Sequence, residues 1–188
     1  MRETRLVLFE GIPGSGKSTA AGRLSQVLAH AGVPHRWWYE EAQGHPLHTY
    51  GDWPSFDWMP EELFSGEAAR RRTVIDAVLE RWGTMAESLA QGEEVGILDG
   101  ALFGHLTWTL FPAGAPDAET MSYVAEAERR VEVAKPCLVY LRQDDLGAGM
   151  RRLAERRGKG WIERKAKQYE ALPYSTERGL QGFDGLVA

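Results

Sequence analysis

One glycine-rich segment restricts what this chain can fold into more than any other feature. Residues 11–18 read Gly-Ile-Pro-Gly-Ser-Gly-Lys-Ser and match the pattern G-x-x-x-x-G-K-[ST] at every fixed position. An apolar run at 5–10 precedes the segment, and a helical pattern at 17–31 follows it. The segment therefore predicts a strand, a tight loop and a helix, with backbone N–H groups at the helix N-terminus turned toward phosphate oxygens.

We expect this loop to hold ATP and Mg²⁺. Lys17 should reach the β- and γ-phosphates, and the Ser18 hydroxyl should hold the magnesium ion. A glycine-rich turn without a ligand is the alternative, and the strand before the loop and the helix after it argue against that alternative. The choice between ATP and GTP stays open. The residues predicted to contact the nucleotide are Gly11, Pro13, Gly14, Ser15, Gly16, Lys17, Ser18 and Thr19.

Short apolar strands alternate with helices along the rest of the chain. The predicted strands are 5–10, 35–40, 95–98 and 137–141, and the main predicted helices are 17–31, 67–91, 117–134, 146–157 and 161–172. This alternation predicts a three-layer α/β/α P-loop NTPase fold with a parallel sheet. A length of 188 residues favours one domain, residues 1–188, with a lid at approximately 146–165.

Composition narrows the classes of function. A net charge of −5 argues against binding to a nucleic acid polymer, because phosphate backbones require a basic face. The sequence contains no apolar run long enough to span a membrane and no signal sequence, so a cytoplasmic protein is expected. Cys137 is the one cysteine, which excludes an intrachain disulfide, and its apolar surroundings predict a buried, inert thiol.

A resemblance to a known group of enzymes appears around the loop. Residues 7–19, Val-Leu-Phe-Glu-Gly-Ile-Pro-Gly-Ser-Gly-Lys-Ser-Thr, resemble the opening of the thymidylate kinase and deoxynucleoside kinase group. The remainder resembles that group in layout. The resemblance implies ATP-dependent transfer of the γ-phosphoryl group to a hydroxyl or phosphate of a nucleoside or nucleotide. It also implies that a homodimer could pack through the helix 67–91, although the oligomeric state stays open.

Two acidic positions are the candidates for catalysis and metal binding. Glu40 and Glu41 end the second predicted strand, and ligands of parallel sheets bind at the carboxyl ends of strands. The resemblance implies that a glutamate here acts as a base; we favour Glu40, and Glu41 is its close rival. Asp99 ends the third strand, where a carboxylate can hold Mg²⁺. The related kinases usually have arginine after this acid, whereas this chain has Gly100.

A basic segment follows the fourth predicted strand and resembles the lid of nucleoside and nucleotide kinases. Arg152 and Arg156 are four residues apart, so they share one helix face, and we expect them to neutralise charge on the transferred phosphoryl group. Gly158 and Gly160 would let the segment move. A solvated basic helix face is the alternative. The cationic residues of the segment are Arg151, Arg152, Arg156, Arg157 and Lys159.

The acceptor side is less clear in the sequence. The loop after the second strand carries His45, His48, Tyr50, Trp53, Phe56 and Trp58. We expect His45 and Trp53 to contact the small-molecule acceptor, with ordinary packing as an equal alternative. Arg70, at the start of the long helix, is a third candidate for contact with the acceptor, and His105 is expected to be a core residue.

A different class of function stays open on the sequence alone. The chain could be a nucleotide-binding hydrolase or switch that acts through a protein partner. It contains no Asn-Lys-x-Asp motif for reading guanine, and Glu40 together with the basic lid favours phosphoryl transfer.

Overall fold

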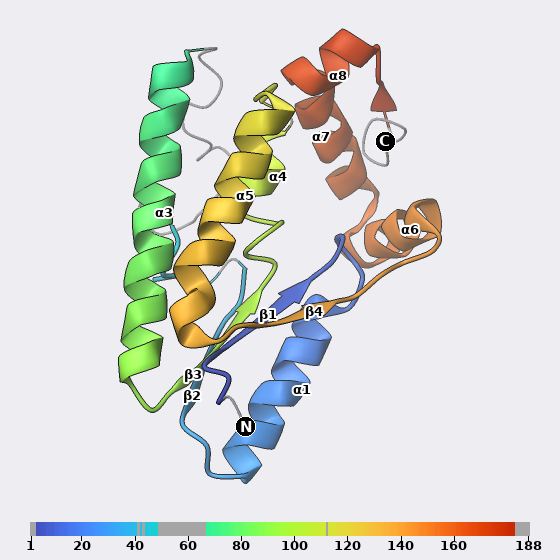
Figure 1. The fold of residues 1–188 in the computed structure, drawn as a ribbon. Helices are drawn as coiled ribbons and strands as arrows, with labels where there is room; N and C mark the ends of the chain where they lie inside the picture. The colour runs from blue at the N-terminus through green and yellow to red at the C-terminus, as the bar shows by residue number, and fades with distance from the viewer. Residues whose placement is uncertain (1–2, 41, 43, 49–66, 112, 183–188) are drawn as a thin grey trace.

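Four parallel strands form the centre of the molecule. The computed structural model describes residues 3–40, 42, 44–48, 67–111 and 113–182. The strands are β1 (Leu6–Glu10), β2 (His35–Trp38), β3 (Val95–Asp99) and β4 (Cys137–Tyr140), and their order in the sheet is β2-β3-β1-β4 (Figure 1). The prediction of an α/β fold with a parallel sheet is confirmed.

Helices cover both faces of this sheet (Figure 1). Helix α1 (Lys17–His30) lies on one face, and α3 (Ala68–Gln91) and α5 (Asp117–Val131) pack against each other on the other face. This arrangement is compatible with the expected three-layer architecture. The remaining helices are α4 (Leu106–Leu110), η2 (Glu132–Ala134), α6 (Leu146–Arg157), α7 (Lys159–Glu170) and α8 (Pro173–Arg178).

The two faces of the sheet bury cores of unequal size. Side chains alternate along a strand, so Leu6 and Leu8 of β1 face α3 and α5, whereas Phe9 faces α1. On the α3 side, Trp82 is fully buried and its indole N–H donates to the hydroxyl of Tyr123 at 3.0 Å. On the α1 side, the cluster of buried residues consists of Phe9, Ala21 and Ile97, with half-buried neighbours around it.

Strand β4 corrects one prediction. It lies at the edge of the sheet, and Cys137, Leu138 and Tyr140 are all exposed. The expectation of a buried Cys137 is therefore wrong. The apolar run 137–141 does predict a strand correctly, but an edge strand has no neighbour on one side to exclude water.

The basic segment folds as two helices, as the sequence predicts. Helix α6 ends at Arg157, Gly158 has a positive φ of 87°, and α7 begins directly after it. The Asp145 carboxylate caps α6 by accepting the Ala148 N–H at 2.7 Å, which satisfies a free donor of the first turn. Among the described residues, no helix has both the length and the apolar character needed to cross a lipid bilayer.

Candidate functional site

Residues 11–18, called the glycine loop below, connect β1 to α1 at the carboxyl end of the sheet. Gly11, Gly14 and Gly16 all have positive φ. At Gly11 a Cβ atom would lie 2.5 Å from the carbonyl oxygen of Leu141, so only glycine fits there. The loop is thus held close to the end of β4, because Leu141 N–H also donates to the Glu10 carbonyl at 2.8 Å.

Lys17 is the first residue of α1 and turns back over the glycine loop. Its side chain is largely buried, and its ammonium group donates to the Ile12 carbonyl at 3.3 Å. The Ser15 N–H donates to the same carbonyl at 3.1 Å, which closes the loop. Ser18 and Thr19 are exposed at the start of the helix. A cation and a helix N-terminus therefore meet above the loop, a combination that favours bound anions.

Asp99 ends β3 beside this lysine. It is fully buried, and neither carboxylate oxygen has a hydrogen bond of normal geometry to a described residue. Burial raises the pKa of Asp99, and the nearby Ser18 side chain and the charge of Lys17 act in the opposite direction. Carboxylate oxygens that are buried, close to a serine hydroxyl and otherwise unused fit a hard divalent cation. Ser18 and Asp99 could therefore hold Mg²⁺.

Glu40 reaches the same place from the segment after β2, because the strand ends at Trp38 and not at Glu40 as predicted. Gly100 follows Asp99 with a φ of +71°, and a Cβ atom at Gly100 would lie 3.1 Å from Cε of Lys17 and 3.2 Å from Oε2 of Glu40. The two side chains thus flank Gly100 closely. The Glu40 carboxylate also lies near Tyr169 of α7: the pKa of the Tyr169 hydroxyl is raised by burial, and the charge of Glu40 adds to the shift.

Helix α6 begins against the glycine loop. The Gln143 side chain donates to the Gly14 carbonyl at 3.2 Å. A Cβ atom at Gly14 would lie 3.4 Å from the Gly149 carbonyl oxygen and 3.6 Å from Cβ of Leu153. The helix that carries Arg152 and Arg156 is therefore packed beside the loop, and both arginine side chains are exposed.

Positively and negatively charged side chains from several elements lie close together around the glycine loop. One buried lysine, two carboxylates at strand ends and an arginine-bearing helix converge on the glycine loop. The sequence predicts each of these residues separately, and parallel strands place their carboxyl ends at one edge of the sheet. Such an arrangement can bind a polyphosphate, hold a cation and deprotonate or orient a hydroxyl.

Comparison with known proteins adds no identification. No family model matches the chain, and no curated protein matches it. A solved structure described as the crystal structure of APE1195 is similar over 98% of this chain and 78% of its own, with a TM-score of 0.44 and 18% identity. These values are too low to support an inference about fold or activity.

Two of the predicted acceptor residues, His45 and Arg70, make contacts within the protein. His45 is buried and stacks on His48 with ring centroids 4.5 Å apart, and its Nδ1 accepts the Leu47 N–H at 3.3 Å. Arg70 is exposed and pairs with Glu67 at 2.9 Å in the first turn of α3. Trp53 and Glu41 lie outside the described residues. Contact of His45, Trp53 or Arg70 with an acceptor stays a prediction.

Two further features near the site have no strong signal in the sequence. Glu10 is fully buried beneath the site, although a charged residue between an apolar strand and a glycine could equally be a solvated strand end. Trp108 of α4 donates to the Tyr169 hydroxyl of α7 at 2.5 Å, and their rings meet at an interplanar angle of 63°. This contact joins residues 61 positions apart. Local patterns do not predict it.

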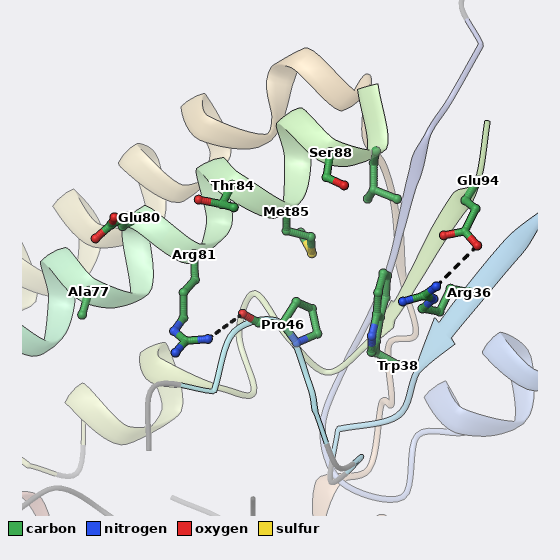
Figure 2. Close-up of a pocket in the computed structure, with 11 residues that line it drawn as sticks. Arg36, Trp38, Pro46, Ala77, Glu80, Arg81, Thr84, Met85, Ser88 and Glu94 are labelled. Carbon is green, nitrogen blue, oxygen red and sulfur yellow. Dashed lines mark hydrogen bonds and ion pairs between the residues drawn. The ribbon is translucent and has the colours of Figure 1, made fainter. Parts of the chain in front are cut away.

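A separate groove of 580 Å³ lies between β2 and α3 (Figure 2). Figure 2 shows Trp38 and Met85 facing each other across it, with the Arg36–Glu94 ion pair of 3.6 Å at one end. At the other end, Arg81 donates to the Pro46 carbonyl at 3.4 Å. None of the residues predicted to bind nucleotide lines this groove.

Proposed function

We propose that this protein is an ATP- and Mg²⁺-dependent phosphotransferase. It adopts a P-loop NTPase fold and transfers the γ-phosphoryl group to a hydroxyl or phosphate of a small molecule. The acceptor is a nucleoside, a nucleotide or a hydroxylated metabolite of similar size. The resemblance of residues 7–19 to thymidylate and deoxynucleoside kinases supports the class of acceptor.

One observation carries the proposal: Lys17 and Glu40 both lie close to the point that a Cβ atom at Gly100 would occupy, Cε of Lys17 at 3.1 Å and Oε2 of Glu40 at 3.2 Å. A phosphoryl transfer site needs a cation aimed at the transferred group and a carboxylate beside the incoming hydroxyl. A carboxylate in that second position can accept a proton from an acceptor hydroxyl or from water. The resemblance to nucleoside and nucleotide kinases favours the hydroxyl, and the acceptor assay below separates the two.

Each residue of the proposed site would then have its own role in the transfer. Bound Mg²⁺ would supply charge neutralisation between the β- and γ-phosphates. Ser18 and Asp99 supply oxygens for that ion, and Lys17 exchanges its contact with the Ile12 carbonyl for phosphate oxygens. Glu40 accepts the proton of the acceptor hydroxyl or orients that hydroxyl for in-line attack. Arg152 and Arg156 approach from α6, where charge develops on the transferred group.

The decisive experiment is ATP turnover with and without a panel of nucleosides, nucleotides and hydroxylated metabolites. We expect ADP release to depend on an acceptor and a phosphorylated acceptor to form in equal amount. ATP hydrolysis at a constant rate with every acceptor would overturn the proposal and favour the hydrolase or switch.

Two substitutions test the roles of the central residues. Lys17→Ala should abolish transfer, because it removes the charge aimed at the phosphates. Glu40→Gln should lower kcat more than it lowers ATP affinity, because the amide keeps the size of the side chain but cannot accept a proton. Glu41→Gln is the matched comparison. If Glu41→Gln lowers kcat and Glu40→Gln does not, the base is misassigned.

A further inference from the structure

Glu10 is a buried carboxylate that the mechanism above does not use. It ends β1 and is 0% exposed. Its Oε1 accepts the Leu102 N–H at 2.6 Å, and its Oε2 accepts the Phe103 N–H at 3.3 Å. Burying a carboxyl group is costly unless it is hydrogen-bonded. Both of its oxygens are used on one short stretch of backbone, so the contact is specific to that stretch.

That stretch is the turn 100–104, which follows β3. Gly100 N–H donates to the Phe9 carbonyl at 2.9 Å, so the turn is tied to β1 at two successive residues. A side chain at Gly104 would overlap the Gly100 carbonyl oxygen, which means that the turn is tightly wound. From the other side, the Thr107 hydroxyl donates to the Leu102 carbonyl at 2.7 Å.

The position of this turn determines the spacing in the site. Lys17 and Glu40 both lie beside Gly100, within 3.2 Å of where its Cβ atom would be. A shift of the turn would therefore alter the separation of the phosphate-binding lysine from the candidate base. Reacting groups have to be placed within a fraction of an ångström, and a misplacement of about 1 Å can lower a rate by about a hundredfold.

We propose that Glu10 is a positioning residue: its carboxylate holds the turn 100–104 so that Lys17 and Glu40 keep their positions beside Gly100. The inference rests on the proposed function. Glu10 touches neither the nucleotide nor the acceptor and acts only through the turn. A carboxylate suits this role because it presents two accepting oxygens to converging N–H groups, whereas an amide presents one oxygen and an NH₂ group that faces another donor.

The contact has a signature that does not depend on enzyme activity. Burial raises the pKa of Glu10 to about 7, against the opposing effect of the N–H groups of Leu102 and Phe103 and the charge of Lys17. Protonation removes one accepting oxygen, so the amides of Leu102 and Phe103 should report the titration directly. Below about pH 7 Glu10 holds the turn 100–104 less firmly, and the rate of transfer should fall as a result.

The test compares wild type with Glu10→Gln and, as a matched control, Glu93→Gln on the exposed turn before β3. Amide NMR shifts of Leu102 and Phe103 are followed from about pH 5.5 to 8.5 in the ligand-free protein, on both sides of the Glu10 pKa of about 7. We expect both amides to titrate together in wild type and in Glu93→Gln and to stay constant in Glu10→Gln. In the transfer assay, Glu10→Gln should lower kcat at least about tenfold while KM for ATP changes little.

Each result decides a separate point. If the amide shifts of Leu102 and Phe103 do not change with pH in wild type, the contact of these amides with Glu10 is overturned. Amides that respond as expected, together with an unchanged kcat in Glu10→Gln, overturn the positioning role. A wild-type protein that transfers phosphate to no acceptor overturns the proposed function and with it the role in transfer, while the NMR titration still decides the contact. If Glu10→Gln does not fold, Thr107→Val releases the same turn from its other side, and an unchanged kcat there also counts against the inference.

Discussion

At the scale of single residues, Gly100 shows how one position joins two parts of a site. In the sequence, Gly100 is only a departure from the arginine that usually follows the acid in the kinases that residues 7–19 resemble. In the structure it has left-handed backbone and lies against Lys17 and Glu40. Absence of a side chain at this position therefore brings a cation and a carboxylate together. A sequence motif cannot reveal this, because the three residues come from separate elements.

Gly100→Ala should damage both stability and transfer. A left-handed φ costs a non-glycine residue on the order of 1 kcal/mol, and the new Cβ would press on Lys17 and Glu40. Gly32→Ala is the matched control, since Gly32 has a φ of +68° with no atom within 4 Å of the added Cβ. We expect similar strain in both variants by urea denaturation, but a large fall in kcat only in Gly100→Ala. Equal kcat values in the two variants would refute the steric argument.

At the scale of elements, helix α6 shows what sequence patterns predict and what they miss. The two basic helices and the break at Gly158 are predicted, because charge, helical spacing and glycine are local signals. The contact of α6 with the glycine loop through Gln143 and Gly14 is not predicted, since it links residues 129 positions apart. That α6 lies beside the glycine loop is therefore known only from the packing, and its role as a lid stays a prediction.

Removing both arginines of the α6 face should impair transfer without affecting folding. Arg152→Ala/Arg156→Ala deletes two exposed cations, and we expect kcat to fall at least about tenfold. The matched control is Arg72→Ala/Arg129→Ala, which removes the same charge from exposed ion pairs with Asp76 and Glu126. Surface ion pairs contribute at most about 1 kcal/mol, so both double variants should fold. A comparable loss of kcat in the control would point to net charge instead of position.

At the scale of the whole molecule, the alternation of strands and helices predicts the parallel sheet, but it does not predict the order of the strands. Cys137 illustrates the difference: an apolar strand at the centre of a sheet and one at its edge have the same local pattern, and only the edge strand is exposed. The acceptor residues are a second case. His45 packs on other histidines, and no periodicity indicates which loop residues pack and which bind.

Stability should fall as the pH is lowered below about 6.5. Burial, followed by the neighbouring His48, lowers the pKa values of both His45 and His105 to about 3. Between about pH 3 and pH 6.5 the unfolded chain therefore binds about two more protons than the folded protein does. This difference destabilises the folded state on acidification. Glu10, with its pKa raised to about 7, opposes this with one proton. Asp99, whose pKa is also raised by burial, adds to this opposition, so the net slope is smaller than the two histidines alone would give.

His45→Phe should flatten this dependence by about one proton, measured as the urea midpoint from pH 7.5 down to 5. His30→Gln serves as the control for removal of a histidine, because His30 is exposed at the end of α1. An equal slope in wild type and His45→Phe would show that the histidine stack is not protonated on unfolding.

The unequal cores on the two faces of the sheet have a consequence for local unfolding. The glycine loop continues into α1, the helix that covers the smaller buried cluster of Phe9, Ala21 and Ile97. Regions with few buried apolar contacts open more often than the global core does. A ligand that binds only when the α1 layer is folded stabilises that layer, and the stabilisation increases with the ligand concentration relative to its Kd. Nucleotide supply would then regulate how long the α1 layer stays protected from amide exchange and proteolysis, while the α3 and α5 layer keeps its protection without any ligand.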